Sequence, residues 1–143
     1  MSTRPSKNMN VSDVALPLGS FPVLPEKALL KTALEEMGKS RLGIVCVTDS
    51  AGRLVGILTD GDIRRKLLSV QKPFSAFFGD DILDHATIGP TTVKPNEPLI
   101  KAVETMEEKQ IWDLPVVDAN GVLTGLLHLH PVVQALLDEN RDG

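Results

Sequence analysis

Hydrophobic positions recur along the chain in two similar series, each a helix-like stripe followed by two strand-like runs. The first stripe consists of Leu30, Ala33, Leu34 and Met37, and the second of Leu99, Ala102, Val103 and Met106. This spacing places each set on one face of an amphipathic helix. Near-continuous apolar runs follow at Ile44–Thr48 and Leu114–Val117, a pattern typical of strands that are covered on both faces.

Turn residues separate each of these runs from a second predicted strand. The turns Asp49–Gly52 and Asp118–Gly121 have hairpin chemistry, and the second ends in Asn-Gly. The second strands are predicted at Leu54–Thr59 and Leu123–His128. A hairpin is therefore expected after each helix.

Short segments complete each series at its two ends. Extended stubs are predicted ahead of the helices, at Phe21–Val23 and at Thr92 and Val93. Closing helices are predicted to begin near Asp62 and near Pro131. The second start is favoured because proline suits the first helical position. Each series thus has the order strand, helix, strand, strand, helix.

The two series are copies of one another. Shifted by 69 positions, Leu30–Thr59 aligns without a gap to Leu99–His128, and ten positions are identical. We therefore predict an α/β (α+β) fold in which two such repeats pack as a pseudo-two-fold pair. The expected organisation is a disordered polar tail over 1–10, a first domain over 11–70, a linker over 71–81 and a second domain over 82–143.

Composition narrows the function classes. The chain has 143 residues and a formal charge of −4, with no Tyr and one Trp, so we expect no binding to nucleic acid or to an anionic membrane. No apolar run approaches the roughly 20 residues of a membrane span. The lone cysteine, Cys46, lies in an apolar run, and no signal peptide precedes it, so a cytoplasmic location is expected.

Two stretches are recognisable in the repeats: Gly52–Asp62 (GRLVGILTDGD), preceded by Val47–Asp49, and Ile111–Asp118 (IWDLPVVD), followed by Gly121–Gly125. They resemble the cystathionine-β-synthase (CBS) domain, which normally occurs as a tandem pair called a Bateman module. The resemblance covers essentially residues 11–137 and implies a regulatory, ligand-binding module.

Two shorter segments, Thr59–Arg65 (TDGDIRR) and Leu126–His130 (LLHLH), carry a narrower similarity. They resemble the regulatory half of arabinose-5-phosphate isomerases, which join a sugar-isomerase domain to a CBS pair. The first segment also occurs in CBS pairs attached to sugar nucleotidyltransferases, so the second decides the comparison. This chain departs from the isomerases at Pro131, where they continue with Asp.

The segment around Thr59 and Asp62 is the main candidate site. A hydroxyl and a carboxylate three residues apart at a helix start can meet a phosphate and the two hydroxyls of a ribose, and Arg64 or Arg65 can add a positive charge. In the CBS family this pattern is the nucleotide-binding signature. The alternative is structural, with Asp62 capping the helix and Thr59 completing the strand end.

Two further positions belong to the strand that lines the cleft in the CBS family. The resemblance assigns Ile44 and Cys46 to the ligand contacts, whereas the apolar run around Cys46 favours a small buried hydrophobe. Trp112 stands where the other copy has Gly43, and it either stacks on a base or is a core or interface aromatic.

His128 and His130 are the remaining candidates for ligand contacts. They are separated by one residue at the end of a predicted strand, so they are expected to share a face. A metal would need a third ligand, for which His85 is the obvious residue, but contact with a ligand or with the partner copy is the favoured interpretation. Because Pro131 replaces the carboxylate, only the first repeat is expected to hold a ribose.

Three hypotheses about function follow. The leading one is a regulatory CBS pair that binds an adenosine or cytidine nucleotide (AMP, ATP or a CMP-sugar) and controls a sugar-phosphate isomerase, attached or separate. The second is a fragment of an arabinose-5-phosphate isomerase, which interconverts ribulose 5-phosphate and arabinose 5-phosphate, without its catalytic domain. The third is a purely structural dimerisation module. The chain alone is not expected to be an enzyme or to bind a metal, and a homodimer is expected.

Overall fold

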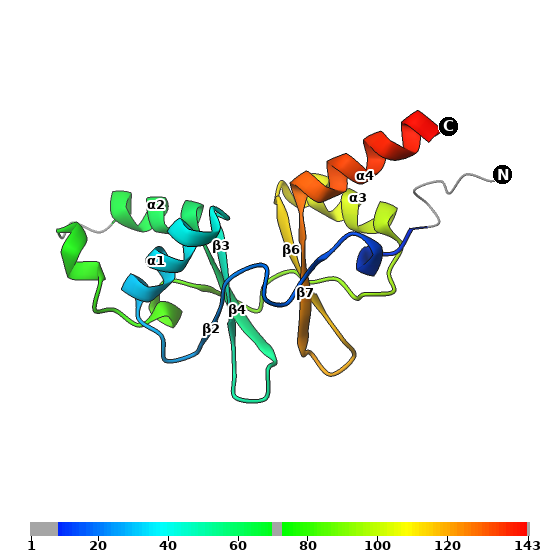
Figure 1. The fold of residues 1–143 in the computed structure, drawn as a ribbon. Coiled ribbons are helices and arrows are strands. Elements are labelled where there is room, and N and C mark those ends of the chain that lie inside the picture. Colours follow the sequence, from blue (N-terminus) through cyan, green and yellow to red (C-terminus); the bar gives the residue numbers. More distant parts are fainter. Residues whose placement is uncertain (1–8, 70–72, 143) are drawn as a thin grey trace. The chain divides into compact units, whose positions relative to one another are not determined.

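The computed structural model describes residues 9–69 and 73–142, which form two compact units. Unit 1 comprises the described residues of Met1–Leu18 and Thr91–Gly143, and unit 2 comprises those of Gly19–Pro90. Each unit contains helices and a small sheet (Figure 1), as the predicted α/β class requires. Among the described residues, no helix has the length and apolar character needed to cross a bilayer.

Unit 2 contains a four-stranded sheet in the order β2-β3-β4-β5. Its elements are β2 (Val23–Pro25), α1 (Leu30–Ser40), β3 (Ile44–Thr48), β4 (Leu54–Thr59), α2 (Asp60–Ser69), the 3₁₀ turns η3 (Phe74–Phe77) and η4 (Ile82–Asp84), and β5 (Thr87–Ile88). Strand β2 runs parallel to β3, and the other neighbours are antiparallel. The predicted stub therefore forms, shifted from Phe21–Val23 to Val23–Pro25.

Unit 1 repeats the central part of this arrangement with a sheet in the order β1-β7-β6. Its elements are η2 (Val11–Asp13), β1 (Leu16–Pro17), α3 (Leu99–Lys109), β6 (Asp113–Val117), β7 (Leu123–His128) and α4 (Leu129–Asp142). The stub predicted at Thr92 and Val93 is reduced to one parallel bridge between Val93 and Val116.

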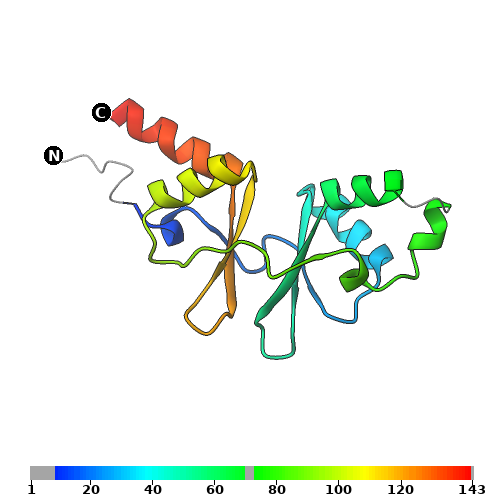
Figure 2. The ribbon, with the colours of Figure 1, turned by 180° about the vertical axis from the view of Figure 1, so that it is seen from behind.

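The two hairpins are alike in detail. Both have a register irregularity at the same place, between Val47 and Thr48 in β3 and between Val116 and Val117 in β6. Seen from behind in Figure 2, the turn of each hairpin lies at the end away from its helices. The same repeated positions therefore produce the same backbone.

The hairpin turns are held by an aspartate carboxylate. Asp49 Oδ1 accepts hydrogen bonds from the backbone N–H groups of Ala51 and Arg53, both at 2.9 Å, and Asp118 Oδ1 makes the equivalent pair of bonds. The backbone N–H of Arg53, aided by that of Ala51, holds the pKa of the Asp49 carboxyl below its usual value.

Both closing helices begin two residues earlier than predicted. The helix α2 begins at Asp60 rather than near Asp62, and α4 begins at Leu129 rather than near Pro131. The N–H of Asp60 donates to the carbonyl of Gly43, and the N–H of Leu129 donates to that of Trp112. These bonds fix the first helical residue, and Pro131 then stands in the first turn, where a missing N–H costs nothing.

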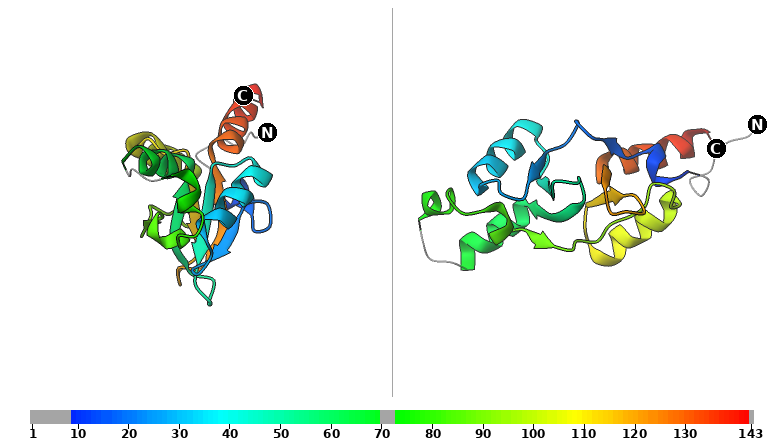
Figure 3. Two further views of the ribbon diagram at one scale, coloured as in Figure 1. Left: turned by 90° about the vertical axis from the view of Figure 1, so that its left-hand side faces the viewer. Right: turned by 90° about the horizontal axis from the view of Figure 1, so that it is seen from below.

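In each unit, one edge strand and the cap of one helix come from a segment that precedes the other repeat in the sequence. Unit 2 uses residues 80–88, and unit 1 uses residues 9–17. The cap residues Leu29 and Pro98 make no side-chain capping bond. Instead, the N–H of Leu30 donates to the carbonyl of Asp80 at 2.8 Å, and the N–H of Leu99 donates to that of Met9 at 2.8 Å. Figure 3 shows the blue segment beside the helices of unit 1. Residues 9–17 and 80–88 therefore have equivalent roles.

These units divide the chain differently from the sequence repeat, whose expected boundaries fall after 70 and before 82. Within the expected linker, 73–81 forms η3 and the loop to η4, with Phe77 buried against α1 and β3 of unit 2. The expected tail at 1–8 and the linker positions 70–72 lie outside the described residues.

Each unit has its own core between its helices and one face of its sheet. In unit 2 the core consists of Leu30, Ala33, Val45, Val47, Leu58, Phe77 and Ile82. In unit 1 it includes Val11, Leu99, Ala102, Met106, Leu114, Val116, Leu127 and Val132. Met106 is buried, whereas its counterpart Met37 is half-buried at the edge of the other core.

Two repeated glycines allow the edge strands to approach closely. A Cβ on Gly56 would lie 2.8 Å from the carbonyl oxygen of Thr87 in β5, and one on Gly125 would lie 2.8 Å from that of Leu16 in β1. Because backbone cannot move as freely as a long side chain, a methyl group at either position would displace the edge strand.

This contact generates a stability test. We expect Gly56→Ala and Gly125→Ala each to lower the free energy of unfolding by about 1–3 kcal/mol, as overpacking does. The control is Gly38→Ala in α1, where a Cβ would meet nothing within 4 Å and helix propensity should raise stability by about 0.5–1 kcal/mol. Urea denaturation measures all three. Equal stability of Gly56→Ala and the wild type would show that β5 does not approach as described.

Candidate functional site

Thr59 and Asp62 bond to each other across the start of α2. Thr59 is the last residue of β4, and Asp62 is the third residue of the helix. The backbone N–H of Thr59 donates to Asp62 Oδ2 at 3.0 Å, and the backbone N–H of Asp62 donates to Thr59 Oγ1 at 3.1 Å. This reciprocal pair is a capping box. The structural alternative considered for these residues is therefore present in unit 2.

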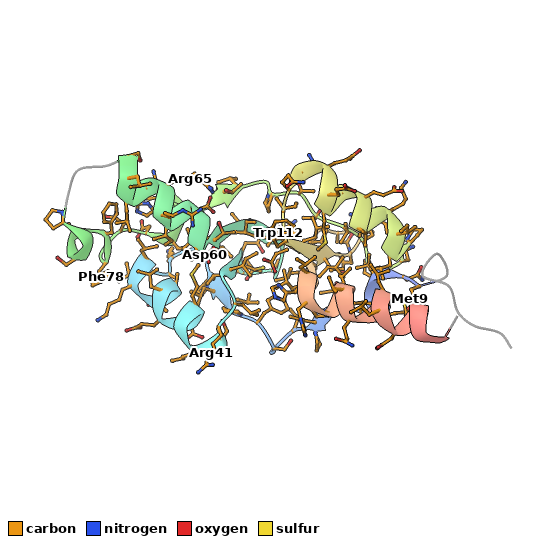
Figure 4. The ribbon with its side chains drawn as sticks, turned by 90° about the horizontal axis from the view of Figure 1, so that it is seen from above. Met9, Arg41, Asp60, Arg65, Phe78 and Trp112 are labelled. Carbon is orange, nitrogen blue, oxygen red and sulfur yellow. The ribbon has the colours of Figure 1, made fainter. Side chains whose placement is uncertain are left out.

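The second carboxylate oxygen of Asp62 is bonded to Arg65. Arg65 Nη2 donates to Asp62 Oδ1 at 2.6 Å. The Asp62 side chain is 15% exposed and the Arg65 side chain 66% exposed. Figure 4 labels Asp60 at the start of α2 and Arg65 farther along the same helix. Arg64, the other candidate cation, is exposed.

Gly61 provides the space in which the guanidinium lies. A Cβ on Gly61 would be 3.3 Å from Arg65 Nη1 and 3.7 Å from Thr59 Oγ1. The guanidinium, the threonine hydroxyl and the carboxylate therefore gather around one glycine at the helix start.

This cluster combines the groups that a phosphorylated sugar requires. The Thr59 oxygen already accepts a bond, so its hydroxyl hydrogen is available to donate to an anion. A carboxylate has about four acceptor positions, and two of those on Asp62 are used. The helix start adds a positive dipole end, and Arg65 adds a full positive charge.

Ile44 and Cys46 are both fully buried in β3. Ile44 is the register partner of Thr59, which places it beside the cluster, and Cys46 lies two residues farther along the strand. The burial of Cys46 agrees with the interpretation as a small hydrophobe. Their assignment as ligand contacts stays a prediction.

Sequence reasoning passed over Asp60 and the role of Gly43. A Cβ on Gly43 would lie 2.7 Å from Asp60 Oδ2, so the Asp60 carboxylate occupies the space beside that glycine. The repeat alignment contained a signal for this contact. Gly43 and Asp60 align with Trp112 and Leu129, so the glycine and the carboxylate occur together in the first copy and are both replaced in the second. Trp112 is 55% exposed, which makes it a surface residue of unit 1 rather than a core residue.

The equivalent place in unit 1 has different chemistry. His128 and Asp113 take the positions of Thr59 and Ile44, and His128 Nδ1 donates to Asp113 Oδ1 at 2.6 Å. His128 ends β7, whereas His130 is exposed in the first turn of α4. The strand geometry from which a shared face was expected does not extend to His130, because the helix begins between the two histidines.

His85, the third residue considered for a metal site, contacts an aspartate of unit 2 instead. Its Nε2 is 2.7 Å from Asp80 Oδ2 in unit 2, where its ring packs against Phe77. Among the residues that the structure describes, no three His, Cys, Asp or Glu side chains are grouped so as to hold a metal ion.

Comparisons with known proteins place this arrangement in a family. The CBS domain matches residues 11–69 and again residues 81–138. The chain is similar to CBSX2 from Arabidopsis thaliana solved in complex with AMP, with 30% identity, a TM-score of 0.81, and coverage of 92% of this chain and 98% of that one.

Curated relatives show a second similarity. The chain is 32% identical over 115 residues to arabinose 5-phosphate isomerase GutQ of Escherichia coli K12, covering 78% of this chain and 34% of the relative. It is 32% identical over 127 residues to arabinose 5-phosphate isomerase KdsD of Yersinia pestis, covering 89% and 37%. The chain thus spans about a third of the length of these relatives.

The two matches to the CBS domain cover most of the chain, at the two places where the sequence repeats itself and the structure forms the same hairpin and helices. The chain therefore belongs to the CBS domain family, and it carries a tandem pair of these domains.

Proposed function

We propose that unit 2 binds an adenine ribonucleotide through Thr59 and Asp62, and that the CBS pair uses this ligand to regulate a sugar-phosphate enzyme. The observation that carries the proposal is the cluster of hydroxyl, carboxylate and guanidinium at the start of α2. The likeness to CBSX2, a protein solved with AMP, supports it. CBS pairs are generally regulatory rather than catalytic, which agrees with a binding role.

Each group has a definite role in this proposal. Asp62 accepts bonds from the two ribose hydroxyls, the Thr59 hydroxyl donates to the phosphate, and the helix dipole favours the negative charge. Ile44 pairs with Thr59 in the sheet and is fully buried, so its role as a ligand contact stays a prediction.

Unit 1 does not offer the same set of groups. Pro131 stands where unit 2 has Asp62, so both the carboxylate and a backbone N–H are missing, and His128 replaces Thr59. We therefore expect one tight nucleotide site per chain, with His128 and His130 in an accessory role.

The regulated enzyme is proposed from the relatives. Arabinose 5-phosphate isomerases GutQ and KdsD match this chain over about a third of their length. We infer that the CBS pair acts on a sugar-phosphate isomerase domain, either joined to it or separate. A cytidine-linked sugar is the alternative ligand, and a binding screen distinguishes it from an adenine nucleotide.

Binding is tested by melting the protein with AMP, ATP, CMP or a CMP-sugar. A ligand at 100 times its Kd adds about 2.7 kcal/mol to stability, which raises the Tm of a protein this size by roughly 5–10 °C. We expect AMP or ATP to produce this shift. A CMP-sugar that shifts the Tm more would replace the adenine ligand, and no shift with any nucleotide would favour a structural module.

The site is tested with Asp62→Asn. The amide oxygen still accepts the N–H of Thr59, so the helix cap survives, but the charged acceptor is lost. Calorimetry should show AMP affinity falling at least about ten-fold. Glu35→Gln, an equal charge change on the exposed face of α1, is the control and should bind normally. Undiminished binding by Asp62→Asn would place the ligand elsewhere.

We further propose that the protein forms a homodimer. Large apolar side chains are exposed on helices of both units, including Leu67 and Leu68 on α2 and Val133 and Leu137 on α4. Covering such surface drives association, and two-fold pairs are the commonest assembly. Sedimentation at micromolar concentration should give twice the 15.5 kDa chain mass, and a species of only 15.5 kDa would contradict the proposal.

A further inference from the structure

Resting on the proposed function, we propose that Arg65 is a specificity-determining residue that makes the site select phosphorylated ribonucleotides over nucleosides. The guanidinium is bonded to the carboxylate that the ribose must use, and only a ligand with a phosphate gives the guanidinium a new anionic partner.

The two carboxylate oxygens of Asp62 have different freedom. Oδ2 accepts the N–H of Thr59 and is part of the capping box, so giving up this bond would uncap α2. Oδ1 is bonded only to a side chain, Arg65 Nη2 at 2.6 Å. A ribose that approaches the carboxylate must therefore share or replace the bond at Oδ1.

Arg65 can leave Oδ1 more easily than the carboxylate can move. The arginine side chain is 66% exposed on a long, flexible stem, whereas Asp62 is 15% exposed and held by the helix start. A Cβ on Gly61 would meet both the guanidinium, at 3.3 Å, and the Thr59 hydroxyl oxygen, at 3.7 Å, so both groups border the same glycine, where the phosphate is proposed to bind. The exposed arginine stem allows the guanidinium to turn from the carboxylate to a phosphate there.

The consequence differs for the two classes of ligand. A nucleoside such as adenosine that replaces the bond at Oδ1 separates Arg65 from Asp62 and leaves the guanidinium without an anion. A nucleotide such as AMP separates the same pair but supplies a dianionic phosphate, which arginine binds through two parallel N–H bonds. The internal ion pair thus opposes nucleosides and is replaced when the ligand carries a phosphate.

Unit 1 lacks both members of this ion pair. Pro131 stands at the position of Asp62, and Gln134 stands at the position of Arg65. Gln134 bonds instead to Asp138, one turn farther along α4. The carboxylate and the arginine occur together only in the repeat that carries the proposed site.

The test compares AMP with adenosine on the wild type and Arg65→Gln by calorimetry. In the variant we expect adenosine to bind about two- to five-fold more tightly, the value of an exposed ion pair, because its competitor is gone. AMP should bind about ten-fold or more weakly, because a charged phosphate contact is lost. Opposite changes for the two ligands are the distinguishing result, since a merely structural defect would weaken both.

Arg53→Gln is the matched control. It removes one arginine of unit 2 and one ion pair at i, i+4, the pair with Asp49 in the hairpin turn, away from the start of α2. We expect it to leave the ratio of AMP to adenosine affinity unchanged. A melt of each variant without ligand confirms that the fold is kept.

Salt concentration provides a second readout. Raising NaCl from about 0.05 to 0.5 M screens the ion pair between Arg65 and Asp62 as well as the phosphate contact. Adenosine should therefore bind the wild type more tightly at high salt, while AMP binds more weakly. In Arg65→Gln the salt effect on adenosine should disappear.

The outcomes separate this proposal from the proposed function. If AMP fails to bind the wild type, the nucleotide site itself is wrong. If AMP binds but Arg65→Gln weakens both ligands equally, or changes neither, the site stands and the selective role of Arg65 is wrong.

Discussion

One backbone hydrogen bond in each unit joins a segment distant in sequence to the start of a helix: Leu30 donates to the carbonyl of Asp80 in unit 2, and Leu99 donates to that of Met9 in unit 1. The residues before α1 and α3 make no side-chain cap, so each helix needs a carbonyl from a distant segment. The same two segments then continue as the edge strands β5 and β1, against Gly56 and Gly125. The helix starts, the sheet edges and the repeated glycines are thus parts of one contact that occurs twice.

The elements that could be predicted from the sequence are those that depend on a local pattern of side chains. Both hairpins and both helices of the aligned repeats were predicted, because apolar spacing and turn residues are sufficient to specify them. The equivalence of 9–17 with 80–88 was missed, because these segments share only Asp13/Asp84 and Ala15/Ala86 and act through carbonyls that any residue carries. At the candidate site, the motif identified Thr59 and Asp62. The strand geometry does not extend to His130, because a backbone bond from Leu129 to Trp112 starts the helix earlier.

Asp62 connects the cap of α2 with the proposed ligand site through one side chain. One of its oxygens completes the cap of α2, and the other is bonded to Arg65. A ligand that recruits this carboxylate therefore acts on the same helix start that the carboxylate stabilises. The corresponding helix in unit 1 begins without such a residue and relies on proline and a long apolar face. The duplication has kept the backbone of both copies while their polar chemistry has diverged.

The division of the chain between the units has a consequence for the order in which the protein folds. Unit 2 is continuous in sequence, from Gly19 to Pro90. The ribosome therefore releases all of its strands, and the groups that cap α1 and α2, before most of unit 1 has been synthesised. The first segment of unit 1 cannot pair until the end of the chain has been made, because β1 pairs with β7 across more than 100 intervening residues. Unit 2 lies within the loop between β1 and β7. Once unit 2 has folded, that loop contains fewer flexible residues, so less conformational entropy is lost when β1 pairs with β7. Unit 2, which carries the proposed nucleotide site, therefore has all of its residues available before those of unit 1 are complete.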